Sequence, residues 1–265
     1  MTGVYYYNGN EYQKRTPLTE FEGLVLASAV SGAILSPLAY LGKPFMNQLK
    51  KEEPNNHIYK DCFEKALKVS GLDERGVEII PAQFANVEKQ FREGTNACFD
   101  PITKKVVVNT DKISCAGFHE LGHALNALKS KYGVKYLAKM RYPGYLIAGL
   151  MEYFAIFSRT KPKGAPRSTG DIIEDNCGKI AFLAMLPVVA EEAIASHRGI
   201  NLAKKAGLNE QLVKNLKKLY SKALLTYGSR AVLGGLAVFA SRKIMDYFTR
   251  PKLIDDNKYY VYNEY

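Results

Sequence analysis

A run of twenty residues without a charged side chain, from Gly23 to Gly42, constrains the fold more than any other part of the 265-residue sequence. In a helix, twenty mostly apolar residues are long enough to cross the hydrocarbon core of a bilayer. The run therefore predicts a membrane anchor at residues 23–42, after a flexible polar tail at residues 1–22. It does not fit a secretory signal, because the acidic residues Glu20 and Glu22 precede it. The alternative is a buried core helix, since three serines and a proline make the run only moderately apolar.

Basic residues are unevenly distributed around this run. Two precede it closely, and four follow it: Lys43, Lys50, Lys51 and Lys60. The cytoplasmic flanks of membrane helices are enriched in lysine and arginine. We therefore expect the protein to lie in the membrane with the residues after the anchor facing the cytoplasm.

Further apolar stretches follow later in the chain. Residues 145–157 and 180–190 are short for a full crossing, so we expect core helices or partly membrane-embedded helices there. Residues 223–240 are apolar except for Arg230 and form a possible second membrane segment. Residues 248–265 are expected to form a polar, tyrosine-rich tail.

The overall composition excludes several classes of protein. Apolar residues make up 47% and charged residues 24% of the chain, which is the balance of a globular protein and not of a disordered or collagen-like one. The four cysteines lie far apart and form no CxxC pair, which argues against a zinc ribbon, a thioredoxin-like site or a disulfide scaffold. The formal charge of +11 is spread along the chain and accompanies no nucleic-acid-binding motif. We therefore expect attraction to a membrane surface and no nucleic acid partner.

The residues between the two membrane candidates predict a mostly α fold with a small β-sheet, of the α+β class. We expect an amphipathic helix around residues 59–69 and strands at residues 77–82, 96–100 and 104–109. Asp100 and Pro101 favour a hairpin between the last two strands. Strand 104–109 is either an edge strand that can bind an extended peptide or an inner strand of the sheet. A helix is then expected from Asp111 to about Lys131, because apolar residues recur there at helical spacing.

The segment His119-Glu120-Leu121-Gly122-His123 lies inside that helix and has the pattern HExxH. Side chains four residues apart share one face of a helix, so His119 and His123 can bind one zinc ion. Glu120 lies about 100° around the helix from His119, where its carboxylate can act as the catalytic general base towards a zinc-activated water. The motif therefore predicts the hydrolysis of amide bonds.

A catalytic zinc needs a third protein ligand. His57 and His197 are available, but Glu191 and Glu192 are better placed at the end of the apolar stretch 180–190. Adjacent residues of a helix point about 100° apart, so only one of these two carboxylates is expected to face the site. Helix geometry alone does not choose between Glu191 and Glu192.

Three sequence elements together resemble a known family: HELGH, then EAIAS as an ExxAS element beginning at Glu192, then ALLTYGSRAVLGGLAVF. Over about residues 96–240 the chain is similar to the neutral zinc metallopeptidases of the bacterial YugP type, and more distantly to the HtpX-type membrane endopeptidases. The resemblance implies a zincin-like mini-gluzincin core around the HExxH helix, within a zinc metallopeptidase domain at residues 43–247. It also implies Glu192 as third ligand, so we expect Glu192 to point inward and Glu191 to turn towards solvent. Ser196 stands where HtpX-type enzymes carry an aspartate that orients a zinc histidine.

A second resemblance leads to a different third ligand. The segments VVVN and FHELGHALN, with a glutamate upstream of MLP, are similar to ImmA/IrrE-type regulatory metallopeptidases. That resemblance implies Glu174 as third ligand, in a soluble enzyme that cleaves a repressor. A catalytically silent, metal-stabilised membrane scaffold is a further alternative, which the intact Glu120 argues against.

The leading hypothesis is a membrane-associated zinc endopeptidase with one catalytic Zn²⁺. Its expected partners are a protein or peptide substrate and membrane lipid, and the sequence carries no signal for an oligomeric state. Candidates to stabilise the oxyanion of the transition state are His197, Arg198 and Tyr227.

Overall fold

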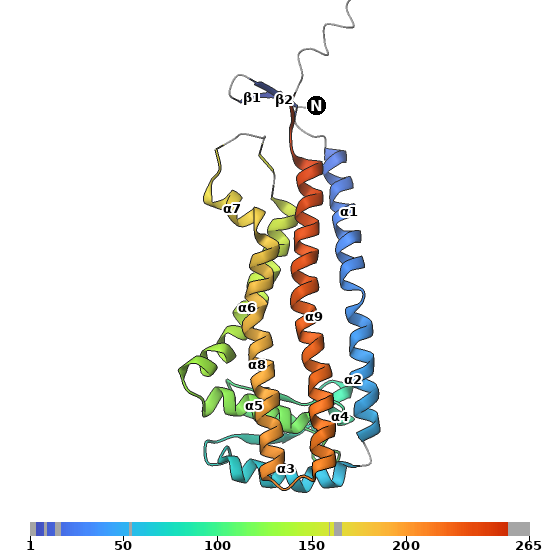
Figure 1. Ribbon diagram of the computed structural model, residues 1–265, viewed down its shortest axis with the longest axis vertical. Helices are drawn as coiled ribbons and strands as arrows, with labels where there is room; N and C mark the ends of the chain where they lie inside the picture. The colour runs from blue at the N-terminus through green and yellow to red at the C-terminus, as the bar shows by residue number, and fades with distance from the viewer. Residues whose placement is uncertain are drawn as a thin grey trace, which may run out of the picture. The chain divides into compact units, whose positions relative to one another are not determined.

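The computed structural model describes residues 4–7, 10–13, 17–52, 55–158, 160–161 and 166–253. The chain is mostly helical with small sheets, which confirms the expected α+β class. The helices are α1 (Pro17–Leu35), α2 (Leu38–Glu52), α3 (Asn56–Ser70), α4 (Lys89–Arg92), α5 (Ala116–Leu128), α6 (Tyr132–Phe157), α7 (Thr169–Asp175), α8 (Cys177–Lys205) and α9 (Glu210–Thr249), as labelled in Figure 1. The strands are β1 (Val4–Tyr7), β2 (Asn10–Gln13), β3 (Glu78–Pro81), β4 (Cys98–Asp100), β5 (Lys105–Val108) and β6 (Lys252–Leu253).

The chain divides into two compact units. The first unit comprises Met1–Ser36, Leu146–Ala184 and Val232–Tyr265, and the second comprises Pro37–Tyr145 and Met185–Ala231. Helices α6, α8 and α9 each contribute residues to both units. The HExxH motif and the acidic pair Glu191 and Glu192 all belong to the second unit.

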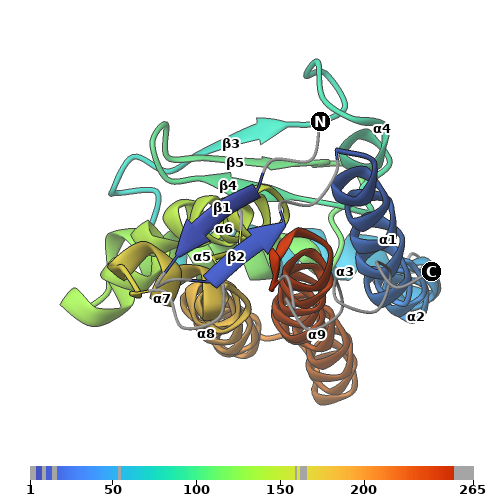
Figure 2. The ribbon, with the colours of Figure 1, turned by 90° about the horizontal axis from the view of Figure 1, so that it is seen from above.

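The second unit contains a three-stranded sheet in the order β3-β5-β4 (Figure 2). β5 pairs in parallel with β3 and antiparallel with β4, so Val106 lies opposite both Ile79 and Phe99. The expected hairpin of β4 and β5 is confirmed. The hypothesis of a peptide-binding edge at residues 104–109 is wrong, because β5 is the inner strand. Val106 and Val108 are completely buried, which favours a position with a strand on either side.

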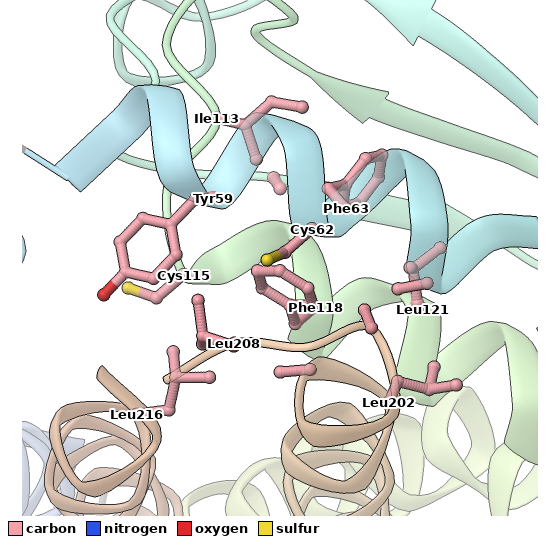
Figure 3. Close-up of a cluster of buried hydrophobic side chains, with 14 of the residues drawn as sticks. Tyr59, Cys62, Phe63, Ile113, Cys115, Phe118, Leu121, Leu202, Leu208 and Leu216 are labelled. Atoms are coloured by element: carbon pink, nitrogen blue, oxygen red, sulfur yellow. The ribbon is translucent and has the colours of Figure 1, made fainter. Parts of the chain in front are cut away.

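Phe118, the residue before the motif, anchors α5 in the core of the second unit. Its ring packs edge to face against Tyr59 and Phe63 of α3, with centroids 6.1 and 6.0 Å away. Figure 3 shows Phe118 between α3 and the corner of α8 and α9, where Leu208 and Leu216 lie. Complete burial of a phenylalanine side chain contributes roughly 1.5–3 kcal/mol. This packing fixes the helix that carries the HExxH motif.

Two predicted helices of the second unit, α3 and α5, begin at residues other than those expected from the sequence. α3 begins three residues earlier than expected and ends at Ser70, where Gly71 follows with a left-handed φ of +58°. α5 begins at Ala116 instead of Asp111. The side-chain oxygen of Asn109 accepts hydrogen bonds from the backbone N–H groups of Asp111 and Lys112, both at 2.9 Å. These bonds hold residues 109–112 in a turn, which delays the start of the helix.

In the first unit, helices pack through small residues and expose large apolar ones. A Cβ atom on Gly178 of α8 would lie 2.7 Å from Phe239 and 2.8 Å from the carbonyl oxygen of Gly235, both in α9. Such close contact at small residues is common where helices pack within a membrane. The large apolar side chains exposed on this unit include Leu18, Phe21, Val25 and Leu26 of α1, Leu146, Leu150, Tyr153, Phe154 and Phe157 of α6, and Val232, Leu236 and Phe239 of α9.

The first unit also contains a sheet that the sequence does not predict. β1, β2 and β6 pair antiparallel, with Val4 opposite Gln13 and Gln13 opposite Lys252. We expected polar tails without regular structure at both ends of the chain. Residues 254–265 of the C-terminal tail lie outside the described residues.

Two helical segments in the described parts of the chain are long and apolar enough to cross a membrane. They are Leu18–Leu41, with a mean hydropathy of 1.9, and a window of α9, with 1.4. The expected anchor at residues 23–42 is not one continuous helix, because α1 ends at Leu35 and α2 begins at Leu38. Pro37 accounts for the break, since proline lacks an N–H and disfavours a helical conformation in the residue before it.

Candidate metal centre

Helix α5 places His119 and His123 one turn apart, with their Nε2 atoms 3.0 Å from each other. The two rings meet edge to face at a centroid distance of 4.5 Å. His123 is buried and His119 is partly exposed. The arrangement follows from the four-residue spacing of the two histidines on one helix.

Glu192 of α8 completes a triangle of donor atoms. Its Oε2 lies 3.0 Å from His119 Nε2 and 3.6 Å from His123 Nε2. Zinc binds nitrogen and oxygen ligands at about 2.0–2.1 Å in a tetrahedron, which separates any two ligands by about 3.3 Å. The three observed separations lie on either side of this value. The residues present therefore fit a zinc ion.

Two glycines let α5 and α8 approach closely enough for this contact. A Cβ atom on Gly122 would lie 2.0 Å from the carbonyl oxygen of Ala195, and one on Gly199 would lie 2.4 Å from that of Phe118. Real Cβ atoms do not come this close to backbone atoms, so any larger residue at either position would push the helices apart. The separation of the histidines from Glu192 thus depends on Gly122 and Gly199.

Glu191 also faces the centre, which contradicts the expectation that it turns towards solvent. Its side chain is buried, and Oε1 accepts a hydrogen bond of 2.8 Å from His123 Nδ1. The amide of Asn126 donates to the same oxygen at 2.8 Å. Both carboxylates can face the site because they approach different atoms of His123: Glu192 lies on the Nε2 side of the ring and Glu191 on the Nδ1 side.

Arg141 of α6 joins the two carboxylates, a role that the sequence analysis missed. Its Nη1 donates to Glu191 Oε2 at 3.3 Å. Its Nη2 forms an ion pair of 2.5 Å with Glu192 Oε1, although the two groups are not aligned as a hydrogen bond. The side chain is 36% exposed, whereas the carboxylates are almost fully covered. No local pattern in the sequence links α6 to α8, so this contact has no sequence signal.

The charges of the centre favour a bound cation. Burial tends to lower the pKa of His123, but hydrogen bonds to Glu191 and Glu192 outweigh this effect and raise the pKa to about 10. Burial tends to raise the pKa of Glu192, but hydrogen bonds from His119 and His123 lower it below its usual range. The pKa of Glu191 is also lowered, because its bond to His123 outweighs burial. The carboxylates of Glu191 and Glu192 are therefore ionised, and His123 between them attracts either a proton or a metal ion.

Glu120 lies beside the histidines without taking part in the triangle. Its Oε2 accepts a hydrogen bond of 2.7 Å from the backbone N–H of Phe99, in the edge strand β4. On the other side, Ser196 places its hydroxyl oxygen 3.3 Å from His119 Nδ1. Each histidine thus has a polar group beside its Nδ1 atom, which fixes the direction of its Nε2 atom.

A cavity of about 630 Å³ opens over the centre. Its wall includes His119, Glu120, His123, Arg141 and Glu191, together with Tyr227 of α9 and several small or apolar side chains. A volume of this size can hold a stretch of a few residues of peptide or a small organic molecule. The two histidines of the triangle lie on this wall and Glu192 does not, so a bound molecule can reach the histidines.

The other residues considered from the sequence lie elsewhere. His197 is exposed and accepts a hydrogen bond of 2.9 Å from the amide of Asn201. Arg198 donates to the hydroxyl of Ser130. Neither lines the cavity, so of the three oxyanion candidates only Tyr227 does so. His57 is exposed on α3. Glu174, in the first unit, forms an ion pair of 3.2 Å with Arg242.

No family model, curated protein or solved structure matches the chain. The resemblances to these peptidase families therefore stay predictions from sequence motifs. The chemistry of the centre rests on its own donor atoms, their distances and their charges.

Proposed function

We propose that this chain is a membrane-associated zinc endopeptidase. The observation that carries the proposal is the triangle of His119 Nε2, His123 Nε2 and Glu192 Oε2, with sides of 3.0, 3.0 and 3.6 Å. Two imidazoles and one carboxylate leave a fourth tetrahedral position open. That ligand set is typical of catalytic zinc and not of structural zinc, which is closed by four protein ligands.

Zinc held by these residues would polarise a peptide carbonyl and lower the pKa of a water molecule towards neutrality. Glu120 is placed to take the proton of that water. The N–H of Phe99 holds its Oε2, which leaves Oε1 for the proton. The carboxyl group then delivers the proton to the departing amine, so Glu120 acts first as general base and then as general acid.

Arg141 is the group that we assign to the oxyanion, in place of His197 and Arg198. Its guanidinium carries five N–H donors, and the carboxylates of Glu191 and Glu192 engage only part of them. The exposed third of the side chain lines the same cavity as Glu120. A carbonyl oxygen that becomes negatively charged there gains a charge-assisted hydrogen bond from Arg141.

The edge strand β4 supports a peptide substrate. It forms an outer strand of its sheet, it contacts α5, and three of its neighbouring residues line the cavity: Asn96, Ala97 and Pro101. Glu120 holds the N–H of Phe99, but the other outward backbone groups of this edge can pair with an extended peptide. The peptide-binding edge is thus assigned to β4 and not to residues 104–109.

The exposure of the apolar segments supports attachment to a membrane. A core helix of a soluble protein is mostly buried, but only 11% of the apolar window in Leu18–Leu41 is buried, and only 22% of that in α9. Water-exposed apolar surface of this extent is unfavourable unless lipid covers it. The excess of lysines after the first segment favours a cytoplasmic active site.

Hydrolysis of unfolded β-casein by the purified, zinc-loaded full chain in detergent tests the proposal. The matched control is Glu120→Gln, which keeps all three zinc ligands but has no carboxylate to accept the proton. We expect cleavage by the wild-type chain and almost none by the variant, at equal zinc content. Equal and negligible cleavage by both would favour the metal-stabilised scaffold instead.

A further inference from the structure

The first half of α6 exposes tyrosines and lysines on one face. This tyrosine-lysine face consists of Tyr132, Lys135, Tyr136, Lys139 and Tyr142. The spacing of three and four residues places all five on one side of the helix. The exposed fractions of the tyrosines are 95%, 60% and 77% in chain order, which is unusual for three aromatic side chains on one helix.

The same segment is strongly basic. Between Glu120 and Glu152 the sequence has five lysines and arginines and no aspartate or glutamate. Two of the five have partners: Lys129 donates to the carbonyl oxygen of Ser70, and Arg141 binds the carboxylates of the metal centre. Within the described residues no ion pair involves Lys135 or Lys139, and both side chains are exposed. Their charge is therefore available to a partner.

We propose that the tyrosine-lysine face docks on the anionic headgroups of the membrane. Tyrosine side chains favour the headgroup level of a bilayer, because the ring lies there in partly apolar surroundings while the hydroxyl stays hydrated. Lysine side chains extend from that level to anionic lipids and add electrostatic attraction. A helix with aromatic and basic residues on its exposed side is typical of segments that lie at this interface.

The continuation of α6 favours lipid over an acidic protein as the partner. After Pro143 the helix has no lysine or arginine, and it exposes Leu146, Leu150, Phe154 and Phe157 together with Tyr145 and Tyr153. The exposed side chains of this one helix thus change from tyrosine and lysine to mainly leucine and phenylalanine, without lysine. The same change of chemistry occurs on passing from the headgroups to the acyl chains of a bilayer.

The proposal rests on the proposed membrane attachment and adds which surface meets the lipid. Ala138 and Arg141 of the same segment line the cavity of the metal centre. Docking of this face would therefore hold the cavity close to the membrane surface. Substrates would then be peptide segments that emerge beside the bilayer.

The chain contains no tryptophan, so a single introduced indole reports its own surroundings. The reporter is Tyr136→Trp in the full chain, reconstituted in vesicles of phosphatidylcholine with brominated acyl chains, with or without phosphatidylglycerol. The matched control is Phe84→Trp, at a position of the second unit that is 86% exposed. A third variant adds Lys135→Gln and Lys139→Gln to the reporter.

We expect the reporter in anionic vesicles to lose roughly half of its fluorescence, as for an indole at the boundary of headgroups and acyl chains. The control should lose little, and the two glutamine substitutions should restore most of the reporter signal. If the protein floats with the vesicles but the reporter is not quenched, the docking is overturned while the membrane attachment stands. That result would favour an acidic protein as the partner of this face. Equal quenching without phosphatidylglycerol would overturn the anionic preference. Failure of the wild-type chain to float would overturn both proposals.

Discussion

The carboxylate of Glu191 lies 2.8 Å from Nδ1 of His123, while Nε2 of the same ring faces His119 and Glu192. A hydrogen bond at Nδ1 fixes both the orientation of the imidazole and the position of its proton. It therefore leaves the lone pair of Nε2 available to a metal. Glu191 therefore orients the ring of His123, whereas its sequence neighbour Glu192 lies beside the nitrogen that is available to the metal.

Replacement of Glu191 by glutamine should weaken zinc binding without removing a ligand. Loss of a partner that orients a zinc histidine typically costs about 10- to 100-fold in metal affinity. We expect a change of this size for Glu191→Gln, measured by competition with a chromophoric zinc chelator. The control Glu93→Ala removes a carboxylate that is 54% exposed and, among the residues that the structure describes, pairs only with Lys89, so its zinc affinity should not change. An unchanged affinity in Glu191→Gln would show that His123 needs no such partner.

Alanine at Gly199 should separate α5 from α8. The added Cβ would lie 2.4 Å from the carbonyl oxygen of Phe118, so the helices must shift. Overpacking of this kind costs about 1–3 kcal/mol, and the shift also moves Glu192 away from the histidines. We expect a lower unfolding temperature and reduced zinc content. The control is Gly133→Ala in α6, where a Cβ meets no atom within 4 Å and both properties should be unaffected. The same behaviour in both variants would contradict the role of this close contact.

Replacement of Arg141 should lower kcat more than it lowers zinc content. Removal of one oxyanion donor typically lowers kcat about 10²- to 10³-fold. We expect a loss of that order in Arg141→Met, partial recovery in Arg141→Lys, and a KM that changes much less than kcat. Zinc content is measured in parallel, because the guanidinium also contacts Glu191 and Glu192. Wild-type kcat in Arg141→Met would remove this residue from the reaction.

Zinc affinity should depend on pH, since the pKa of His123 without metal is about 10. Below that value the ring holds a proton that the metal must displace. The affinity should therefore rise about tenfold per pH unit above neutrality and level off beyond the pKa of the ring. In Glu191→Gln the bond that raises this pKa is weakened, and the plateau should begin at lower pH. Equal pH profiles of the two proteins would contradict the assigned cause of the shift.

The features that the sequence predicts well are local ones. The pairing of His119 with His123 follows from one helical turn, and the hairpin of β4 and β5 follows from the turn residues Asp100 and Pro101. The expected contact of Glu192 with the histidines is also present, although it joins residues 73 positions apart. Its identification came from a motif resemblance and not from periodicity.

The features that the sequence analysis missed depend on tertiary contacts. The angle between adjacent helical residues correctly predicts that Glu191 and Glu192 point in different directions. It does not reveal that the ring of His123 contacts Glu191 through Nδ1 and lies beside Glu192 at Nε2. Arg141 reaches the centre from another helix, and no residue near it in sequence marks that contact. The strands β1 and β2 pair with each other and with β6 at the far end of the chain, which no local pattern encodes.

Zinc stoichiometry of three purified proteins tests the central claim most directly. Elemental analysis is made on the full-length wild-type chain, on Glu192→Ala and on Glu174→Ala, each dialysed against the same weak chelator. Removal of one of three protein ligands should lower zinc affinity by orders of magnitude. Glu174 instead pairs with Arg242, 3.2 Å away. We predict one zinc per chain in the wild type and in Glu174→Ala, and almost none in Glu192→Ala. Zinc retained by Glu192→Ala and lost from Glu174→Ala would contradict the account and assign the third ligand to Glu174.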